Sequence, residues 1–283
     1  MIPAGFEYVA PATVDEALAA LAGSGDAKVL AGGQSLMPVL RMRLAAPELL
    51  VDLGKLDELR GIREDGDAIV IGAMTPHSVV QSDPLVAEHA KLLALATEKV
   101  GDPQIRHRGT FGGSLAHADP AADLPAAAVA LGAEMVVAGQ SGRRTVPAGE
   151  FFTDLFTTAV GEDELLVEIR VPKHTGWGAH YEKFTQTAQQ WPIVGVAAAV
   201  RLENGTIAEA GVALTNMGST PVRATAVEQA LVGQSASDES VRTAAASAAE
   251  GTSPPSDLQG DAEYRRHLAT VLTRRAVLAA AGV

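Results

Sequence analysis

The residues best suited to chemistry in this sequence lie in two short turns, each built around a pair of glycines. The two turns are Ala31, Gly32, Gly33, Gln34, Ser35 and Thr110, Phe111, Gly112, Gly113, Ser114. Glycine lets the backbone approach a ligand closely, and successive backbone N–H groups in such a turn form a concavity that suits phosphate oxygens. We therefore hypothesise that the two turns grip the two phosphates of one dinucleotide.

Neither turn fits the Rossmann fingerprint, which needs three glycines at fixed spacing and a helix that begins at the phosphate. A single glycine pair is most often a plain turn, so the phosphate interpretation depends on the two turns together. Arg106, His107 and Arg108 precede the second turn. This basic cluster could attract a phosphate, or it could be a solvated loop.

Three more residues have side chains that suit a bound nucleotide. Asp123 could accept from a ribose hydroxyl, or it could cap the helix that follows it. Trp191 could cover a flat heterocycle, and Lys183 could stabilise negative charge on a reduced ring. The alternative for this pair is a core tryptophan and a surface lysine. We predict no metal site and no catalytic acid–base group.

Composition limits the kinds of site that the chain can hold. The 283 residues have a formal net charge of −12, which argues against a nucleic-acid surface. An acidic protein should hold a diphosphate with aligned N–H groups rather than with a basic patch. The absence of cysteine excludes disulfides, thiolate zinc and iron–sulfur ligation within the chain. A redox centre must therefore be an organic cofactor or lie in a partner.

The sequence also gives an expectation about location. Its first residues lack the basic and long apolar regions of a signal peptide. No apolar run reaches the ~20 residues that a transmembrane helix needs. We expect a soluble, cytoplasmic protein with no transmembrane segment.

The elements that position the first turn form a small α/β unit. A strand over residues 28–30 precedes the turn, a helix over 36–42 follows it, and a strand over 49–52 completes the unit. Thr13 and Glu16 form a capping box for an earlier helix. A polar stretch over residues 54–66 marks a boundary.

The second turn belongs to a larger unit with strands and helices. We predict a strand over 68–72, a helix opened by Thr75 and Pro76, a single helix over 84–100, a helix over 124–131 capped by Asp123, and a strand over 165–171. The third region begins near His174. Its clearest signal is Asn204-Gly205, which joins two strands of an antiparallel sheet, and its helices end in an exposed or subunit-facing basic stripe that includes Arg265.

Longer segments around these residues resemble the FAD-binding medium subunits of molybdenum hydroxylases. The resemblance is to the aerobic carbon monoxide dehydrogenase type, and the flavin domain of xanthine dehydrogenase is related. It covers nearly the whole chain, with the motifs in the expected order. The matching segments are residues 28–36, 105–114, 118–125, 191–197, 221–224 and 264–266.

The resemblance implies an α+β protein with the FAD-binding fold of the p-cresol methylhydroxylase type. Two α/β subdomains, residues 1–55 and 56–173, would hold non-covalent FAD between them, and residues 174–283 would form a C-terminal domain with an antiparallel sheet and helices. Both glycine turns would bind the pyrophosphate through backbone N–H groups. Asp123 would lie near the ribose and diphosphate, and Leu166, Lys183 and Trp191 near the isoalloxazine.

One departure from the family concerns the flavin environment. The family commonly has basic residues and an Asp before its aromatic residue, whereas this chain has Gln186, Gln189 and Gln190. The redox environment of the flavin, and its electron acceptor, could therefore differ from those of the family.

The resemblance also implies partners. The chain would be the flavoprotein of an oxidoreductase complex, with a large subunit that carries the molybdenum cofactor and a small subunit that carries [2Fe-2S] clusters, arranged as a dimer of heterotrimers. FAD would relay electrons from the clusters to an external acceptor. Two alternatives stay open here: a stand-alone FAD-dependent oxidoreductase and a flavin-free scaffold. The sequence names neither the substrate nor the acceptor of the complex.

Overall fold

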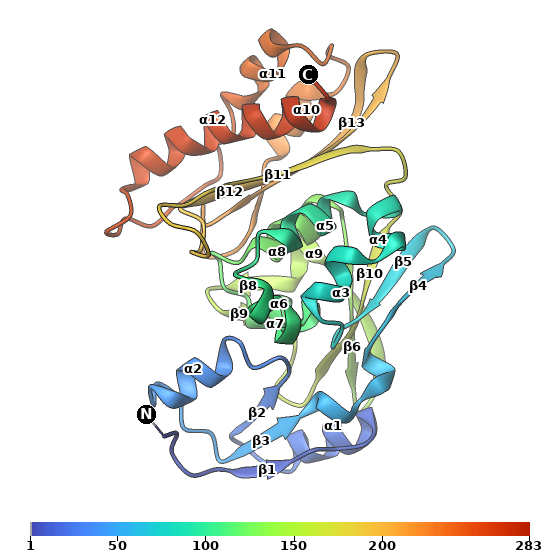
Figure 1. The fold of residues 1–283 in the computed structure, drawn as a ribbon, viewed down its shortest axis with the longest axis vertical. Helices are drawn as coiled ribbons and strands as arrows, with labels where there is room; N and C mark the ends of the chain where they lie inside the picture. The colour runs from blue at the N-terminus through green and yellow to red at the C-terminus, as the bar shows by residue number, and fades with distance from the viewer. Residues whose placement is uncertain (1) are drawn as a thin grey trace.

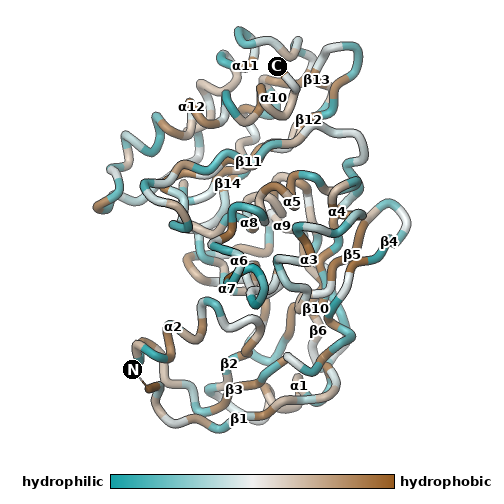
Figure 2. The backbone as a smooth tube through the Cα atoms, in the orientation of Figure 1, coloured by the Kyte–Doolittle hydropathy of each residue, from teal (hydrophilic) through white to brown (hydrophobic). Residues whose placement is uncertain are grey.

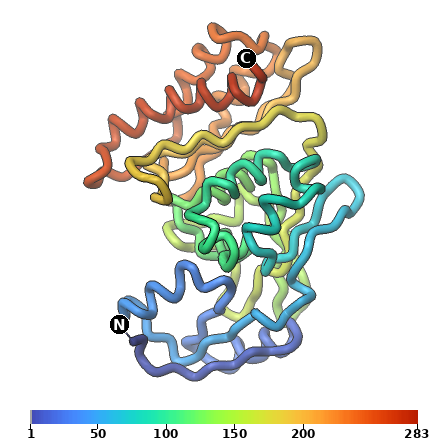
Figure 3. The backbone as a smooth tube through the Cα atoms, viewed as in Figure 1, coloured from blue at the N-terminus to red at the C-terminus, as the bar shows by residue number. Residues whose placement is uncertain are grey.

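The computed structural model describes residues 2–283, and three main sheets with their helices are stacked along its long axis (Figure 1). The N-terminal sheet lies at one end and the C-terminal sheet and helices at the other, with the middle of the chain between them (Figure 3). Mixed helix and sheet, with an antiparallel C-terminal sheet, confirms the predicted α+β class. The proposed domain limits stay a prediction.

The N-terminal sheet is parallel and has the strand order β1-β3-β2. Its elements are β1 (Glu7–Val9), α1 (Val14–Ala22), β2 (Ala27–Leu30), α2 (Leu36–Arg41) and β3 (Leu49–Asp52). The N-cap of the predicted capping box is confirmed, because Thr13 Oγ1 accepts from the N–H of Glu16 at 3.2 Å. Glu16 Oε2 accepts in turn from the N–H of Ala12, at 2.8 Å, rather than from that of Thr13. The 3₁₀ turns Leu53–Lys55 and Asp57–Leu59 lead to the next sheet.

The middle sheet is antiparallel, with the order β4-β5-β10-β6-β7. Its strands are β4 (Ile62–Asp65), β5 (Ala68–Gly72), β6 (Glu134–Gly139), β7 (Gly142–Pro147) and β10 (Leu165–Pro172). The helices of this unit are α3 (His77–Ser82), α4 (Pro84–His89), α5 (Lys91–Glu98), α6 (Pro103–Arg108), α7 (Phe111–His117), α8 (Asp123–Ala130) and α9 (Ala148–Phe151). A small hairpin, β8 (Phe152–Asp154) and β9 (Thr157–Thr158), follows α9.

The C-terminal sheet is antiparallel and has the order β11-β12-β13-β14. Its elements are β11 (Gly178–Phe184), β12 (Val194–Glu203), β13 (Thr206–Thr215), β14 (Val222–Arg223), α10 (Thr225–Leu231), α11 (Asp238–Ala245) and α12 (Ala262–Ala281). The predicted hairpin is confirmed, and Asn204 and Gly205 both have positive φ, at 52° and 81°.

Helix α8 is the centre of the largest core. All eight of its residues are buried, and the same core includes Tyr181, Ala197 and Ala213 from the C-terminal sheet. A helix that is apolar on every side must be buried on every side. Hydrophobic colouring is accordingly strong around α5, α8 and β5 in the interior (Figure 2). The middle and C-terminal units therefore share one core.

Several local predictions are wrong, each for a tertiary reason. The helix expected over 84–100 is split at Ala90, and the carbonyl of the preceding His89 instead accepts from the N–H of His174 at 2.7 Å. Thr75 does not cap α3, because its hydroxyl pairs with the backbone of Gly61. Arg265 is not on an exposed stripe, because it is fully buried against Asp257.

Among the helices of residues 2–283, none combines the length and apolar character that a membrane crossing requires.

Candidate functional site

The first glycine turn follows the carboxyl end of β2 and leads into α2. Gly33 has φ of +76°, in the left-handed region that favours glycine. Within residues 2–283, no backbone carbonyl accepts a hydrogen bond from the N–H groups of Gly32, Gly33, Gln34 or Ser35. Unpaired backbone N–H groups in a left-handed turn suit an anionic ligand. This turn has the donors that the phosphate hypothesis requires.

The second glycine stretch differs from the prediction, because it is the first turn of helix α7 rather than a loop. Thr110 is the N-cap, and its Oγ1 accepts from the N–H of Gly113 at 3.2 Å. Gly112 donates to the carbonyl of Ala73 and Ser114 to the carbonyl of Thr110. These N–H groups already have partners within the protein. The stretch therefore offers a close backbone approach and the partly exposed hydroxyl of Ser114 rather than a row of unpaired amides.

The two stretches meet in space. A Cβ placed on Gly32 would lie 2.2 Å from the carbonyl oxygen of Arg108 and 2.7 Å from the Cα of Gly109. A Cβ on Gly113 would lie 3.3 Å from the Cβ of Ala31. The chain path in Figure 3 shows the same approach, between the segment that joins β2 to α2 and the green segment around α6 and α7. Two turns that touch are the arrangement that a shared diphosphate requires.

A buried histidine supports the backbone of this junction. His77 is 4% exposed, and its backbone N–H donates to the carbonyl of Gly109 at 2.9 Å. Burial, with a smaller contribution from the charge of Arg106, lowers the pKa of His77 to about 4. The ring is therefore neutral near pH 7. His77 was missed in the sequence, where only the preceding Thr75 and Pro76 gave a signal.

Asp123 and Lys183 form the second part of the site. The Asp123 carboxylate accepts from Lys183 Nζ at 2.8 Å and from the Tyr181 hydroxyl at 2.8 Å. Lys183 Nζ also donates to the carbonyl of Lys99 at 2.9 Å. Burial raises the pKa of Asp123, and the ammonium of Lys183 opposes that rise. The expected capping role of Asp123 is wrong, because its carboxylate accepts from β11 rather than from the amides of α8.

The structure is the opposite of the alternative in which Trp191 is a core residue and Lys183 lies on the surface. The Lys183 side chain is only 9% exposed, because the carboxylate of Asp123 compensates its charge. Trp191 is 56% exposed. Its neighbours are nevertheless fixed, since Asn216 Nδ2 donates to the carbonyl of Pro192 at 2.9 Å and Arg265 donates to the carbonyl of Ile193. An exposed indole on an anchored backbone suits contact with a flat ligand.

Leu166 lies on β10 beside an irregularity in the pairing with β6. It is buried, at 6% exposure. The next carbonyl, that of Val167, accepts from the N–H of Ala73, and the carbonyl of Ala73 accepts from Gly112. Hydrogen bonds thus connect the backbone beside Leu166 to the second glycine stretch.

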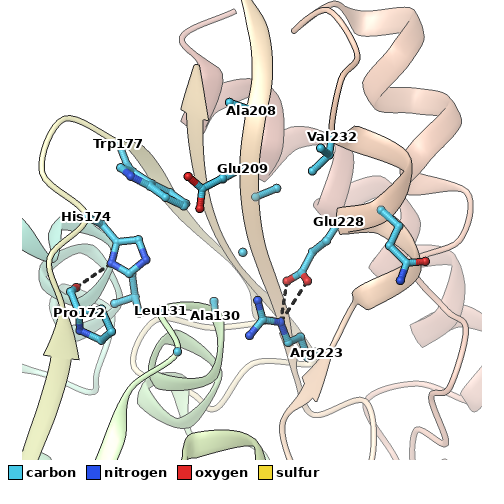
Figure 4. Close-up of a pocket in the computed structure, with 14 residues that line it drawn as sticks. Ala130, Leu131, Pro172, His174, Trp177, Ala208, Glu209, Arg223, Glu228 and Val232 are labelled. Atoms are coloured by element: carbon cyan, nitrogen blue, oxygen red, sulfur yellow. Dashed lines mark hydrogen bonds and ion pairs between the residues drawn. The ribbon is translucent and has the colours of Figure 1, made fainter. Parts of the chain in front are cut away.

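Two pockets differ in their relation to these residues. The larger, of about 600 Å³, lies between the end of α8 and the β13–α10 region, and it contains His174, Trp177 and the Arg223–Glu228 ion pair (Figure 4). None of the predicted site residues lines it. The smaller, of about 290 Å³, is lined by Lys183, Lys99, Gly101 and Gln189 among others. The smaller pocket is the better candidate because it includes a predicted residue whose charge is fixed in place.

Comparison with known families accounts for nearly the whole chain. Residues 4–174 match the family model described as the FAD binding domain in molybdopterin dehydrogenase, and residues 179–280 match the CO dehydrogenase flavoprotein C-terminal domain.

Full-length relatives agree with these matches. The chain is 44% identical to the carbon monoxide dehydrogenase medium chain of Hydrogenophaga pseudoflava, over 99% of this chain and 98% of that protein. It is 35% identical to the glyceraldehyde dehydrogenase medium chain of Sulfolobus acidocaldarius, over 98% of each. A solved structure of the carbon monoxide dehydrogenase from Hydrogenophaga pseudoflava superposes with a TM-score of 0.96 at 45% identity, covering 99% of this chain and 98% of that chain.

Proposed function

Because the chain belongs to the family of FAD-binding subunits of molybdenum-dependent dehydrogenases, we propose that it is the electron-transfer subunit of such a complex. It would receive electrons from the [2Fe-2S] clusters of a small partner subunit and pass them to an external acceptor. Substrate oxidation would take place at the molybdenum cofactor of a large partner subunit. Similarity to the carbon monoxide dehydrogenase medium chain favours a complex of that type.

The meeting of the two glycine stretches is the observation that carries this proposal. The contact between Gly32 and the Arg108–Gly109 backbone leaves no room for a side chain, and the turn beside it has unpaired N–H groups. We propose that residues 31–35 and 110–114 hold the FAD diphosphate there. FAD needs such a cradle because the chain as a whole is strongly anionic.

The remaining predicted residues would hold the other end of FAD. We propose that Lys183, Trp191 and Leu166 border the isoalloxazine. The resemblance implies that Asp123 lies near the ribose and diphosphate. Because its carboxylate accepts from Tyr181 and Lys183, we propose instead that it acts on the isoalloxazine through Lys183. Bound FAD supplies the conversion between single-electron and two-electron transfer. The protein binds it, orients it and fixes a charge beside it.

The assembly and its location are parts of the same proposal. We propose a dimer of heterotrimers in the cytoplasm, with this chain, the molybdenum subunit and the iron–sulfur subunit in each half. The division of the chain at residues 55 and 173 follows from the same assignment, because FAD would lie between the first two subdomains.

The test begins with the purified full-length chain and its visible spectrum. We expect non-covalent FAD, released by denaturation, at close to one equivalent for each chain. The flavin should stay oxidised when carbon monoxide or an aldehyde is added to the chain alone, and it should be reduced when both partner subunits are present. A colourless chain that cannot be reconstituted with FAD would refute the assignment. Reduction by substrate without partners would instead indicate a stand-alone oxidoreductase.

A further inference from the structure

The largely buried ammonium of Lys183 is held by groups from two elements other than its own. Asp123 belongs to α8, Lys183 belongs to β11, and Lys99 follows α5. An ammonium has three N–H groups, and Asp123 and the carbonyl of Lys99 engage two of them. This leaves one for a ligand in the pocket of about 290 Å³ that Lys183 lines.

Tyr181 supplies the second hydrogen bond to the Asp123 carboxylate. Its ring is 2% exposed, and its hydroxyl donates to Asp123 Oδ1 at 2.8 Å, while Lys183 occupies Oδ2. The hydroxyl also lies 3.3 Å from Thr215 Oγ1 on β13. Space for it exists because residue 195 is glycine, where a Cβ would lie 2.7 Å from the phenolic oxygen. Both oxygens of the carboxylate are therefore fixed.

The protonation state of Tyr181 makes it a permanent donor. Burial and the charge of Asp123 raise its pKa well above the ordinary value for tyrosine, so the phenol stays protonated at physiological pH. A neutral donor to a buried carboxylate offsets part of the carboxylate charge without adding a charge of its own.

We propose that Tyr181 is a positioning residue for the flavin, which holds the Asp123 carboxylate so that Lys183 presents a fixed, partly compensated positive charge to the isoalloxazine. The inference depends on the proposed function, because it assumes FAD beside Lys183. Tyr181 does not line the pocket of about 290 Å³, and it would act on the flavin only through its hydrogen bond to Asp123.

The proposal predicts the direction in which Tyr181→Phe changes the midpoint potential of bound FAD. Reduction adds negative charge to the flavin, and a nearby ammonium favours it while a nearby carboxylate opposes it. Tyr181→Phe removes one donor from Asp123 and leaves more of the carboxylate charge uncompensated. The midpoint potential of bound FAD should therefore become more negative, with FAD occupancy unchanged because the diphosphate contacts are elsewhere.

The experiment is spectroelectrochemistry on the FAD-loaded full-length chain. Wild type and Tyr181→Phe are compared, and the same substitution is repeated in an Asp123→Asn background. If Tyr181 acts through the carboxylate, the shift in midpoint potential should be present in the first pair and absent in the second. If Asp123→Asn does not retain FAD, Tyr181→Phe is instead measured in a Lys183→Met background, where its shift in midpoint potential should likewise be absent.

Tyr8→Phe is the matched control. The Tyr8 hydroxyl donates to Asp52 Oδ2 at 2.6 Å, so it is the same type of pair, but Tyr8 is 54% exposed and lies on β1. It should leave the potential unchanged. An unchanged or more positive potential in Tyr181→Phe at full FAD occupancy overturns the inference alone, and so does an equal shift in the Asp123→Asn background. Failure of the wild-type chain to bind FAD would instead overturn the proposed function.

Discussion

Gly32→Ala tests the junction of the two glycine stretches with the smallest possible change. The added Cβ would lie 2.2 Å from the carbonyl oxygen of Arg108, where ordinary contacts begin at 3.4 Å. Both groups are backbone, so neither can move aside as a side chain would. The two stretches must therefore separate by about 1 Å.

The cost follows from that displacement. Overpacking of a well-packed contact costs roughly 1–3 kcal/mol. If FAD requires the stretches to be in contact, the displacement also weakens binding, and about 1.4 kcal/mol corresponds to a tenfold change in Kd. We expect Gly32→Ala to bind FAD roughly 5- to 100-fold more weakly than wild type.

The assay is titration of the apoprotein with FAD, followed by flavin fluorescence, together with thermal unfolding of the apoprotein. Gly25→Ala is the control, because it lies in an exposed turn where a Cβ meets nothing within 4 Å. Wild-type FAD affinity in Gly32→Ala, whatever its thermal stability, would refute the assignment of this junction to the diphosphate.

Three further predictions concern the same framework. The pKa of His77 is lowered to about 4, so the folded state loses about 3 kcal/mol of stability as the pH falls from 6.5 to 4, and this stability is fully present above pH 6.5. His77→Asn should remove this part of the pH dependence of unfolding in urea, whereas the exposed control His267→Asn should not. Gly33→Val forces a branched residue to φ of +76°, at a cost of roughly 1–2 kcal/mol, and should lower the FAD content of the purified chain; full occupancy would count against the turn as a ligand site. Arg265→Met removes the donor to the Ile193 carbonyl and the ion-pair partner of Asp257, so it should lower the stability measured by thermal unfolding by about 1–3 kcal/mol. The exposed control Arg266→Met should change stability little, and equal effects of the two variants would contradict the buried role of Arg265.

Local signals in the sequence predict much of the fold. The N-cap of α1 and the Asn204-Gly205 turn each depend on residues within a few positions, and both are confirmed. The α+β class follows from the resemblance, whereas the order of elements at the N-terminus predicts only a small α/β unit. The contact between the two glycine stretches also agrees with the hypothesis, although no local rule places residues 32 and 108 together.

The errors share one cause, which is a partner distant in sequence. The second glycine stretch is helical although glycine disfavours helices, because Ala73 and Thr75 accept from its first amides. The helix over 84–100 is split at Ala90, where the preceding carbonyl accepts from His174.

The burial of Lys183 illustrates the limit of sequence reasoning most clearly. A lysine is ordinarily exposed, and the sequence supports burial only if its counter-charge is known. That counter-charge is Asp123, 60 residues away, and the third member, Tyr181, gives no signal beyond an apolar ring in a strand. Long-range pairs of charges are therefore the part of this site that pattern analysis cannot supply.

The two halves of the proposed site would accommodate the charge of FAD in different ways. A chain with a net charge of −12 must bind an anionic cofactor without a large basic patch. At the first glycine turn, unpaired N–H groups supply partial positive charge, and they need no counter-ion. At the other end, the positive charge of Lys183 is placed beside Asp123, so the pair adds no net charge. Amide dipoles and a compensated pair both act over short range, so in the proposed site the affinity and potential of the flavin would depend on how closely β2, α7, α8 and β11 are held together.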